Sequence, residues 1–179
     1  RGRVTNEYID AMKAAWTQTA PAYAGEFVNF SNIETDPRPV QAPHPPIWIG
    51  GESLSALRRV VSHGDGWYPF GSNPKFRMDT VETYSKRRDR LFALTDEVGR
   101  DPDSIALTYN CAFHNEEEQQ RPDGSRLCFT GLPEQRAADI MAFGEAGISM
   151  MVLNLTANEE GAMLDRMEAF SKEVMPLVG

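Results

Sequence analysis

The stretch PHPPIWIGGESLSALRRVVSHGDGWYPF, residues 43–70, decides the fold. Three apolar residues at positions 47–49 follow a proline-rich entry and stop at two glycines, a carboxylate and a hydroxyl. These four residues are Gly50, Gly51, Glu52 and Ser53. A short apolar run bounded by prolines and glycines is typical of a buried strand.

A helix and a second strand follow within the same stretch. Apolar residues recur at helical spacing over positions 54–61, and Gly64 is suited to end the helix as its C′ residue. Residues 65–68 predict another short strand, which Pro69 terminates. The order strand, helix, strand indicates parallel strands joined by a right-handed crossover.

The same alternation extends through most of the chain. Periodicity predicts helices over residues 5–16 (with Thr5 as N-cap), 74–98, 133–146 and from 158 onward, and strands over 105–113 and 148–155. The proline-rich residues 17–46 and the hydrophilic residues 115–126 predict loops. One helix followed by four strand–helix units predicts an α/β fold with a parallel sheet, either half of a (β/α)8 barrel or a small open sheet.

Composition excludes several functional classes. The 179 residues are in the range of one domain, and the net charge of −8 disfavours nucleic acid and anionic membranes as partners. No apolar run approaches the roughly 20 residues that span a bilayer, and the opening residues lack a signal-peptide pattern. Cys111 and Cys128 lack metal-ligand spacing, so we expect free thiols in a cytoplasmic protein. Because a helical pattern starts directly after Arg1, we expect the interior of a longer chain.

The glycine pair lies where parallel α/β proteins bind their ligands, at the carboxyl end of a strand. Glycines let backbone N–H groups approach an anion, and the following helix offers its positive N-terminal end. Ser53 can both cap that helix and donate its hydroxyl to a phosphate oxygen. Glu52 suits a phosphate only if it faces away or receives a ribityl hydroxyl. An ordinary strand-to-helix turn with a serine cap explains these residues about as well.

Other residues give weaker signals. Trp48 and Trp67 can either flank a ring system or fill a barrel core. The three histidines lack the spacing of metal ligands, so no metal site is expected; they are His44, His63 and His114. Asn110 and His114 follow the third strand and are candidate substrate contacts, whereas His63 is expected to complement a helix dipole.

The C-terminal third supplies apolar residues for the core and no hydrolase motif. A G-x-S-x-G sequence is absent, which argues against a Ser-His-Asp hydrolase. Several methionines fall at core periodicity and are interpreted as packing residues: Met150, Met151, Met163 and Met167. The last helix is predicted to turn Met163, Met167, Phe170 and Val174 inward.

Four motifs resemble the luciferase-like monooxygenase family, particularly the branch that uses the deazaflavin coenzyme F-420. The run at residues 43–69 is the most specific. GRDPDSI (99–105), GLPEQRAADIMAFGEAGI (131–148) and MMVLNL (150–155) continue the similarity in the same order. The resemblance implies that residues 1–179 are the C-terminal half of a (β/α)8 barrel, with helix 4 and strand–helix units 5 to 8.

The resemblance also implies a cofactor site. It places Gly51, Glu52 and Ser53 in the loop after the fifth strand that contacts the cofactor phosphate, and Gly50 and Trp48 complete the cofactor-binding candidates. Ala56 stands near a position where the family often has a hydroxyl, so one contact is expected to be missing. GLPEQ resembles the family's Gly-Thr-Pro-Glu-Glu helix start, but Leu132 replaces the hydroxyl residue. That change removes an N-cap worth about 1 kcal/mol and weakens anion binding there.

The implied activity is that of a flavin- or deazaflavin-dependent oxidoreductase, which performs hydride transfer or oxygenation on a small organic substrate. Coenzyme F-420 is the expected cofactor and FMN the alternative. Because the cofactor carries the chemistry in such enzymes, the sequence assigns no catalytic residue.

A second hypothesis is that the chain is a non-catalytic half barrel. Four parallel strands leave two open edges, so such a chain would fold only by pairing with its N-terminal half or with a second copy. A metal-dependent TIM-barrel hydrolase is disfavoured because the ligands are missing.

Overall fold

The computed structural model describes residues 2–179, in which four parallel strands form one sheet in the order β3-β4-β5-β6. The strands are β3 (Trp48–Gly50), β4 (Gly66–Tyr68), β5 (Ala106–Cys111) and β6 (Met150–Leu153). They alternate with the helices α2 (Leu54–His63), α3 (Val81–Val98), α4 (Pro133–Glu145) and α5 (Glu160–Ala169), and a 3-10 turn, η1 (Pro102–Ser104), precedes β5. Each strand pairs in parallel with the next one along the chain, which confirms the predicted α/β fold.

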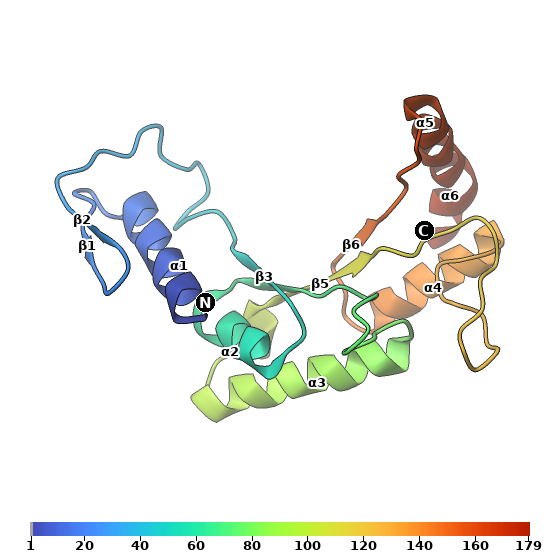
Figure 1. The fold of residues 1–179 in the computed structure, drawn as a ribbon, viewed down its shortest axis with the longest axis horizontal. Helices are drawn as coiled ribbons and strands as arrows, with labels where there is room; N and C mark the ends of the chain where they lie inside the picture. The colour runs from blue at the N-terminus through green and yellow to red at the C-terminus, as the bar shows by residue number, and fades with distance from the viewer. Residues whose placement is uncertain (1) are drawn as a thin grey trace.

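The two faces of the sheet differ in their cover. Helices α2 and α3 lie along one side of it, as Figure 1 shows, and Ile49 and Trp67 are buried on that side. Because side chains alternate along a strand, their neighbours point to the opposite face. There Trp48 is 37% exposed, Met150 48% and Val152 39%. This uncovered side is called the inward face below, because it corresponds to the interior of a barrel.

An aromatic cluster forms the core between the sheet and its helices. Trp67 of β4 stacks on Tyr84 of α3 with ring centroids 5.5 Å apart. Tyr109 of β5 contacts Phe143 of α4 at 4.9 Å, and Phe143 contacts Phe129 at 4.8 Å. All five rings are fully buried. Trp67 is therefore a core residue, the second of the two roles considered for it.

The segment before the sheet contains more structure than the sequence predicted. Helix α1 (Gly2–Thr17) begins before Thr5, so the predicted N-cap at Thr5 is wrong. A small antiparallel hairpin, β1 (Tyr23–Ala24) and β2 (Asn29–Phe30), lies within the expected loop at 17–46. Helix α1 is tied to α2 by His63, whose Nδ1 lies 2.9 Å from Asp10 Oδ1.

Capping geometry corrects one predicted helix boundary, and a second boundary is confirmed. Helix α3 begins at Val81 rather than at 74, because the Thr80 hydroxyl accepts the Thr83 N–H and fixes the first turn. The predicted end of α2 is confirmed, because the helix ends at His63 and Gly64 follows it as the C-cap residue, with φ −96°. Glycine is needed there for space, since a Cβ would lie 2.7 Å from Ile49 Cγ1.

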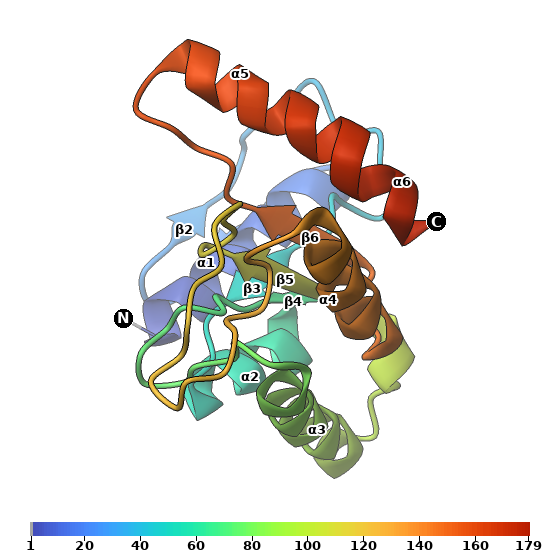
Figure 2. The same ribbon diagram turned by 90° about the vertical axis from the view of Figure 1, so that its right-hand side faces the viewer.

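The C-terminal helices stand away from the sheet. Helix α5 continues through a π-helical turn, η2 (Phe170–Val174), into α6 (Met175–Val178), and Figure 2 shows this rod above the remaining helices. Of the predicted inward residues only Val174 is buried, and Met167 is largely exposed. The packing role predicted for Met150 is also wrong, because its side chain lies on the uncovered inward face. No helix within residues 2–179 combines the length and apolar character needed to cross a bilayer.

Candidate functional site

The loop between β3 and α2 is shaped by the second glycine of the pair. Gly51 has φ +105°, a conformation that residues with a Cβ rarely adopt. A Cβ on Gly51 would also lie 3.2 Å from the Ala56 Cβ, so the loop curls tightly onto the first turn of α2. The Gly51 carbonyl accepts the Trp67 Nε1–H at 2.9 Å, which fixes the loop to the core. Both the glycine and the small Ala56 are therefore required by packing.

Ser53 is the N-cap of α2, as predicted. Its Oγ accepts the Ala56 N–H at 3.2 Å and lies 2.9 Å from the Ser55 Oγ. The first backbone bond of the helix runs from Leu57 N to Ser53 O. The N–H groups of Leu54 and Ser55 precede that bond and remain available to a ligand at the positive end of the helix. Ser55 was not singled out from the sequence, although it supplies a second hydroxyl beside the buried Ala56.

Glu52 faces away from the start of α2. Its side chain is 3% exposed, and Oε1 accepts the Phe70 N–H at 2.7 Å. Oε2 accepts a hydrogen bond from Asn73 Nδ2. The carboxylate thus connects the loop after β3 with the loop after β4. An anion at the helix start does not meet this negative charge, which resolves the difficulty that Glu52 posed in the sequence.

An aromatic strip runs along the inward face beside this loop. Trp48 lies 6.1 Å from Tyr68, and Tyr68 lies 5.6 Å from Phe70, measured between ring centroids. Gly66 makes room for the indole, because a Cβ there would lie 2.5 Å from Trp48 Cδ1. Asn110 of β5 donates from Nδ2 to the Tyr68 Oη at 2.6 Å. Trp48, Tyr68, Phe70 and Asn110 therefore present apolar and hydrogen-bonding surface next to the α2 start.

The structure separates the remaining candidates. Gly50, Gly51, Glu52 and Ser53 lie together at the carboxyl end of β3, with Trp48 on the same strand. His44 Nδ1 lies 2.9 Å from the Pro45 carbonyl oxygen. His63, at the end of α2, pairs with Asp10 of α1 in addition to its expected place beside the helix dipole. His114 lies apart from these residues, against Arg136 of α4. Within residues 2–179, no three acidic, histidine or cysteine side chains gather as a metal site would require.

The two thiols are unreactive in this fold. Cys111 and Cys128 form no disulfide. Burial raises the pKa of Cys111 to about 12 and that of Cys128 to about 11, so both are protonated at neutral pH. Neither side chain can therefore act as a nucleophile without a change in its surroundings.

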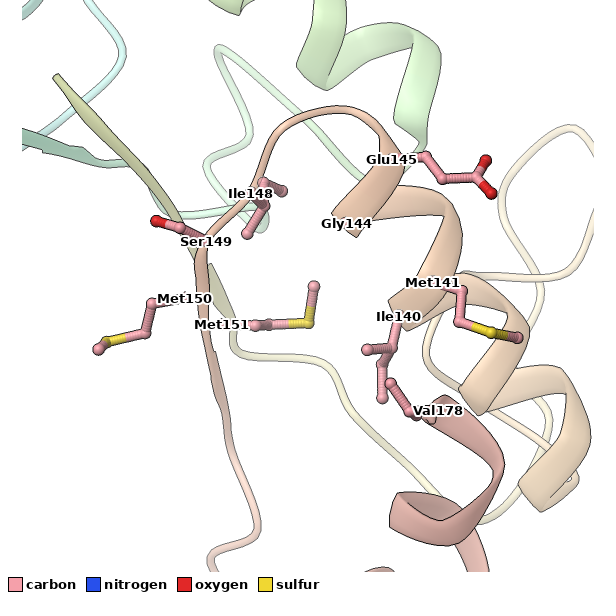
Figure 3. Close-up of a pocket in the computed structure, with 9 residues that line it drawn as sticks. All are labelled: Ile140, Met141, Gly144, Glu145, Ile148, Ser149, Met150, Met151 and Val178. Carbon is pink, nitrogen blue, oxygen red and sulfur yellow. The ribbon is translucent and has the colours of Figure 1, made fainter. Parts of the chain in front are cut away.

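An apolar cavity lies at the opposite end of the strands from these groups. A cavity of about 470 Å³ opens between α4, α6 and the start of β6. Figure 3 shows Ile140, Met151 and Val178 directed toward one another, whereas Met150 points to the other side of the strand. This cavity is apolar and lies at the amino end of β6. Barrel enzymes place their chemistry at the carboxyl ends, so we do not assign it the active site.

The start of α4 agrees with the sequence interpretation. Leu132 precedes the helix and provides no side-chain cap. Its N–H donates to the Gln135 Oε1 at 2.8 Å, and its side chain offers no hydroxyl to an anion. The α2 start is therefore better suited to an anion than the α4 start.

Comparison with known proteins identifies the family. The luciferase-like monooxygenase family model matches residues 1–123, more than half of the chain, and the chain belongs to this family. An FMNH2-dependent dimethylsulfone monooxygenase of Pseudomonas putida is 25% identical over 218 aligned positions, which cover 99% of this chain and 58% of that protein. The pyrimidine monooxygenase RutA of Acinetobacter baylyi is 24% identical over 157 positions, 84% of this chain and 41% of that protein.

Solved structures agree on the fold. An F-420-dependent secondary alcohol dehydrogenase, in complex with an F-420–acetone adduct, matches with a TM-score of 0.72 at 15% identity, over 99% of this chain and 62% of that one. The long-chain alkane monooxygenase LadA matches with a TM-score of 0.69 at 14% identity, over 98% and 55%. The chain thus has the fold of part of a luciferase-like (β/α)8 barrel, and it spans between 41% and 62% of the length of these relatives.

Proposed function

We propose that this chain supplies the cofactor-phosphate side of a reduced-flavin-dependent monooxygenase that acts on a small organic substrate. The observation that carries the proposal is the start of α2. Ser53, Ser55 and two free backbone N–H groups converge there at the positive end of a helix, while the Glu52 carboxylate is turned inward. Gly51 adopts the φ of +105° that lets the loop curl tightly onto the first turn of α2.

The inward face fits the remainder of a flavin. A tricyclic ring presents a flat apolar surface, and Trp48, Tyr68 and Phe70 form an aromatic strip beside the proposed phosphate position. When bound, the reduced ring supplies the electrons for hydride transfer or oxygen activation. The chain's own residues hold the phosphate, orient the ring and exclude water.

FMN is the cofactor that the comparisons favour for the proposal. The Pseudomonas putida relative, aligned over nearly the whole chain, is FMNH2-dependent by name. Coenzyme F-420 is the second candidate, supported by the fold shared with the F-420-dependent alcohol dehydrogenase. Both carry a phosphate, so the α2 start suits either one.

A matched pair of substitutions at Ser53 tests the phosphate contact. Ser53→Asn and Ser53→Asp are close in size and both cap helices well, so α2 should stay intact in each. Only Asp adds a negative charge. A hydrogen bond to a charged group contributes about 1.5–3 kcal/mol, so we expect Asp to bind FMN at least tenfold more weakly than Asn.

Riboflavin, which lacks the phosphate, is the ligand control for that pair. The two variants should bind riboflavin within about twofold of each other, measured by anaerobic fluorescence titration of the reduced ligands. Equal FMN affinities for Ser53→Asn and Ser53→Asp would contradict the proposal. A parallel titration with F-420 decides between the two cofactors.

The open inward face favours a second proposal about assembly. β3 and β6 are the edge strands of the sheet, and large apolar groups on that face are exposed. We propose that the face is completed either by the rest of an eight-stranded barrel or by a second copy of the chain. The molar mass in solution, measured by light scattering, distinguishes a monomer from a pair of copies.

A further inference from the structure

A small polar cavity lies at the carboxyl ends of β5 and β6, apart from the α2 start. Its volume is about 40 Å³. Five side chains from the loops after the two strands and from α5 line it: His114, Asn115, Glu116, Asn154 and Arg166. A water needs roughly 10–15 Å³ of such space, so the cavity holds about three oxygen atoms.

A buried arginine lies directly behind this cavity. Arg136 of α4 is 3% exposed, and its Nη1 lies 3.2 Å from the His114 Nε2. Its Nε is buried without a hydrogen-bond partner. Within residues 2–179 no carboxylate lies within ion-pair distance of the guanidinium. Burying a cation in this way is costly unless an anion compensates it.

The groups around the cavity are almost all donors. His114 has its pKa lowered to about 4 by burial and by the nearby Arg136 and Arg166, so its ring is neutral at pH 7. Neutral His114 accepts from Arg136 through Nε2, which leaves Nδ1 as a donor. Arg166 bonds only to the Thr156 carbonyl and forms no ion pair within the described residues.

The two asparagines are oriented by their own loops. The Asn154 Oδ1 accepts the Thr156 N–H at 3.1 Å, and the Asn115 Oδ1 accepts the Glu117 N–H at 3.0 Å. Their oxygens are thus occupied. The Asn154 Nδ2 also donates to the Ala112 carbonyl oxygen at 3.5 Å, so one of its N–H bonds and the NH2 group of Asn115 are left to donate. The opposing group is Glu116, whose exposed side chain forms no ion pair within residues 2–179.

We infer that this cavity binds an oxyanion, namely the carboxylate, sulfonate or phosphate group of a small molecule. One cation, Arg166, lines a space of about three oxygen atoms together with His114 and two asparagines, and a second cation, Arg136, lies behind His114. The site lies with the proposed cofactor site among the carboxyl-end loops, so an acidic substrate group and a cofactor phosphate are the two sources of such an anion.

Sulfate titration in a Ser53→Asp background tests the inference. The aspartate blocks anion binding at α2, so any remaining saturable stabilisation by sulfate, at ionic strength held constant with chloride, reports another site. We expect Arg166→Gln to raise the apparent dissociation constant for sulfate at least tenfold in that background. Arg38→Gln is the matched control, because exposed Arg38 also bonds to one backbone carbonyl, that of Thr19, and should change the constant less than twofold.

Arg136→Met is the second variant, and it should weaken sulfate binding to a similar extent. If Arg136→Met does not fold, the Arg166→Gln variant alone tests the inference, because Arg166 is exposed and its replacement should not affect folding. The absence of saturable sulfate binding in the Ser53→Asp protein, or unchanged constants in the arginine variants, would overturn the inference. Sulfate binding is measured without flavin, so its result is independent of the proposed function.

Competition between sulfate and FMN in the protein with the native Ser53 then identifies the source of the anion. Displacement of sulfate from the Arg166-dependent site by FMN but not by riboflavin supports the inference and assigns the anion to the cofactor phosphate. Sulfate binding that persists at saturating FMN supports it as well and assigns the cavity to an acidic group of the substrate.

Discussion

Replacing Glu52 by glutamine tests the link between the two strand-end loops. The glutamine has the same shape but one acceptor oxygen, and its amide NH2 would face a second donor. In the native chain the two oxygens accept from Phe70 N at 2.7 Å and from Asn73 Nδ2. One of these donors must lose its partner, at a cost of about 1–3 kcal/mol for a buried group.

The free energy of unfolding measured with urea is the appropriate readout. We expect Glu52→Gln to lower the midpoint with an unchanged m value, which indicates lost stability rather than a changed unfolded state. Glu173→Gln is the matched control, because Glu173 is exposed and forms no ion pair within residues 2–179. It should stay within about 0.5 kcal/mol of the native protein.

FMN affinity of the same variant separates two orientations of Glu52. If the carboxylate faced the phosphate at about 4 Å, removing its charge would relieve about 4 kcal/mol at an effective dielectric of 20 and tighten binding more than a hundredfold. With the carboxylate turned inward, the variant should bind FMN equally well or more weakly, because the loop is loosened. A urea midpoint equal to that of the native protein, or much tighter FMN binding by Glu52→Gln, would refute the role assigned to Glu52.

Two further predictions concern the inward face and the buried histidine. Gly66→Ala should displace the Trp48 indole and shift its fluorescence, because the new Cβ would lie 2.5 Å from the Trp48 Cδ1. Gly161→Ala is the control and should leave the spectrum unchanged, because nothing lies within 4 Å of its new Cβ. An unshifted Gly66→Ala spectrum would contradict this geometry. The His114 pKa of about 4 lies below its unfolded value of about 6.5, so the unfolded state binds more protons between these pH values and stability falls as pH decreases through that window. His114→Gln should flatten this part of the urea-measured pH profile, and an unchanged slope would argue against a buried, neutral ring.

The order of strands and helices could be predicted because it depends on local periodicity. The residues of β3 and α2 show their period within a few positions, and the glycine pair marks their junction. Helix α3 was predicted too long because residues 74–80 are also compatible with a helical pattern. The start is set by the Thr80–Thr83 capping box, a local signal that periodicity alone does not include.

The chemistry of the site depended on contacts that periodicity cannot reveal. Glu52 follows the glycines, so its position was evident, but its orientation depends on Phe70, 18 residues later in the chain. Arg136 was overlooked because a charged residue in an amphipathic helix is ordinarily solvated. Only the fold places it behind His114, where the charge becomes significant.

The two proposed anion-binding positions constrain each other. The α2 start follows β3 at one edge of the sheet, whereas the polar cavity lined by His114 and Arg166 follows β5 and β6 at the other edge. Neighbouring strands are about 4.8 Å apart, so two to three strand intervals separate the positions by roughly 10–14 Å. One phosphate group cannot contact both, and the Tyr68–Asn110 hydrogen bond lies between them on the inward face. If α2 holds the cofactor phosphate, the cavity at β5 and β6 is left for a second acidic group, and the aromatic strip is the surface on which the ring and the substrate would meet.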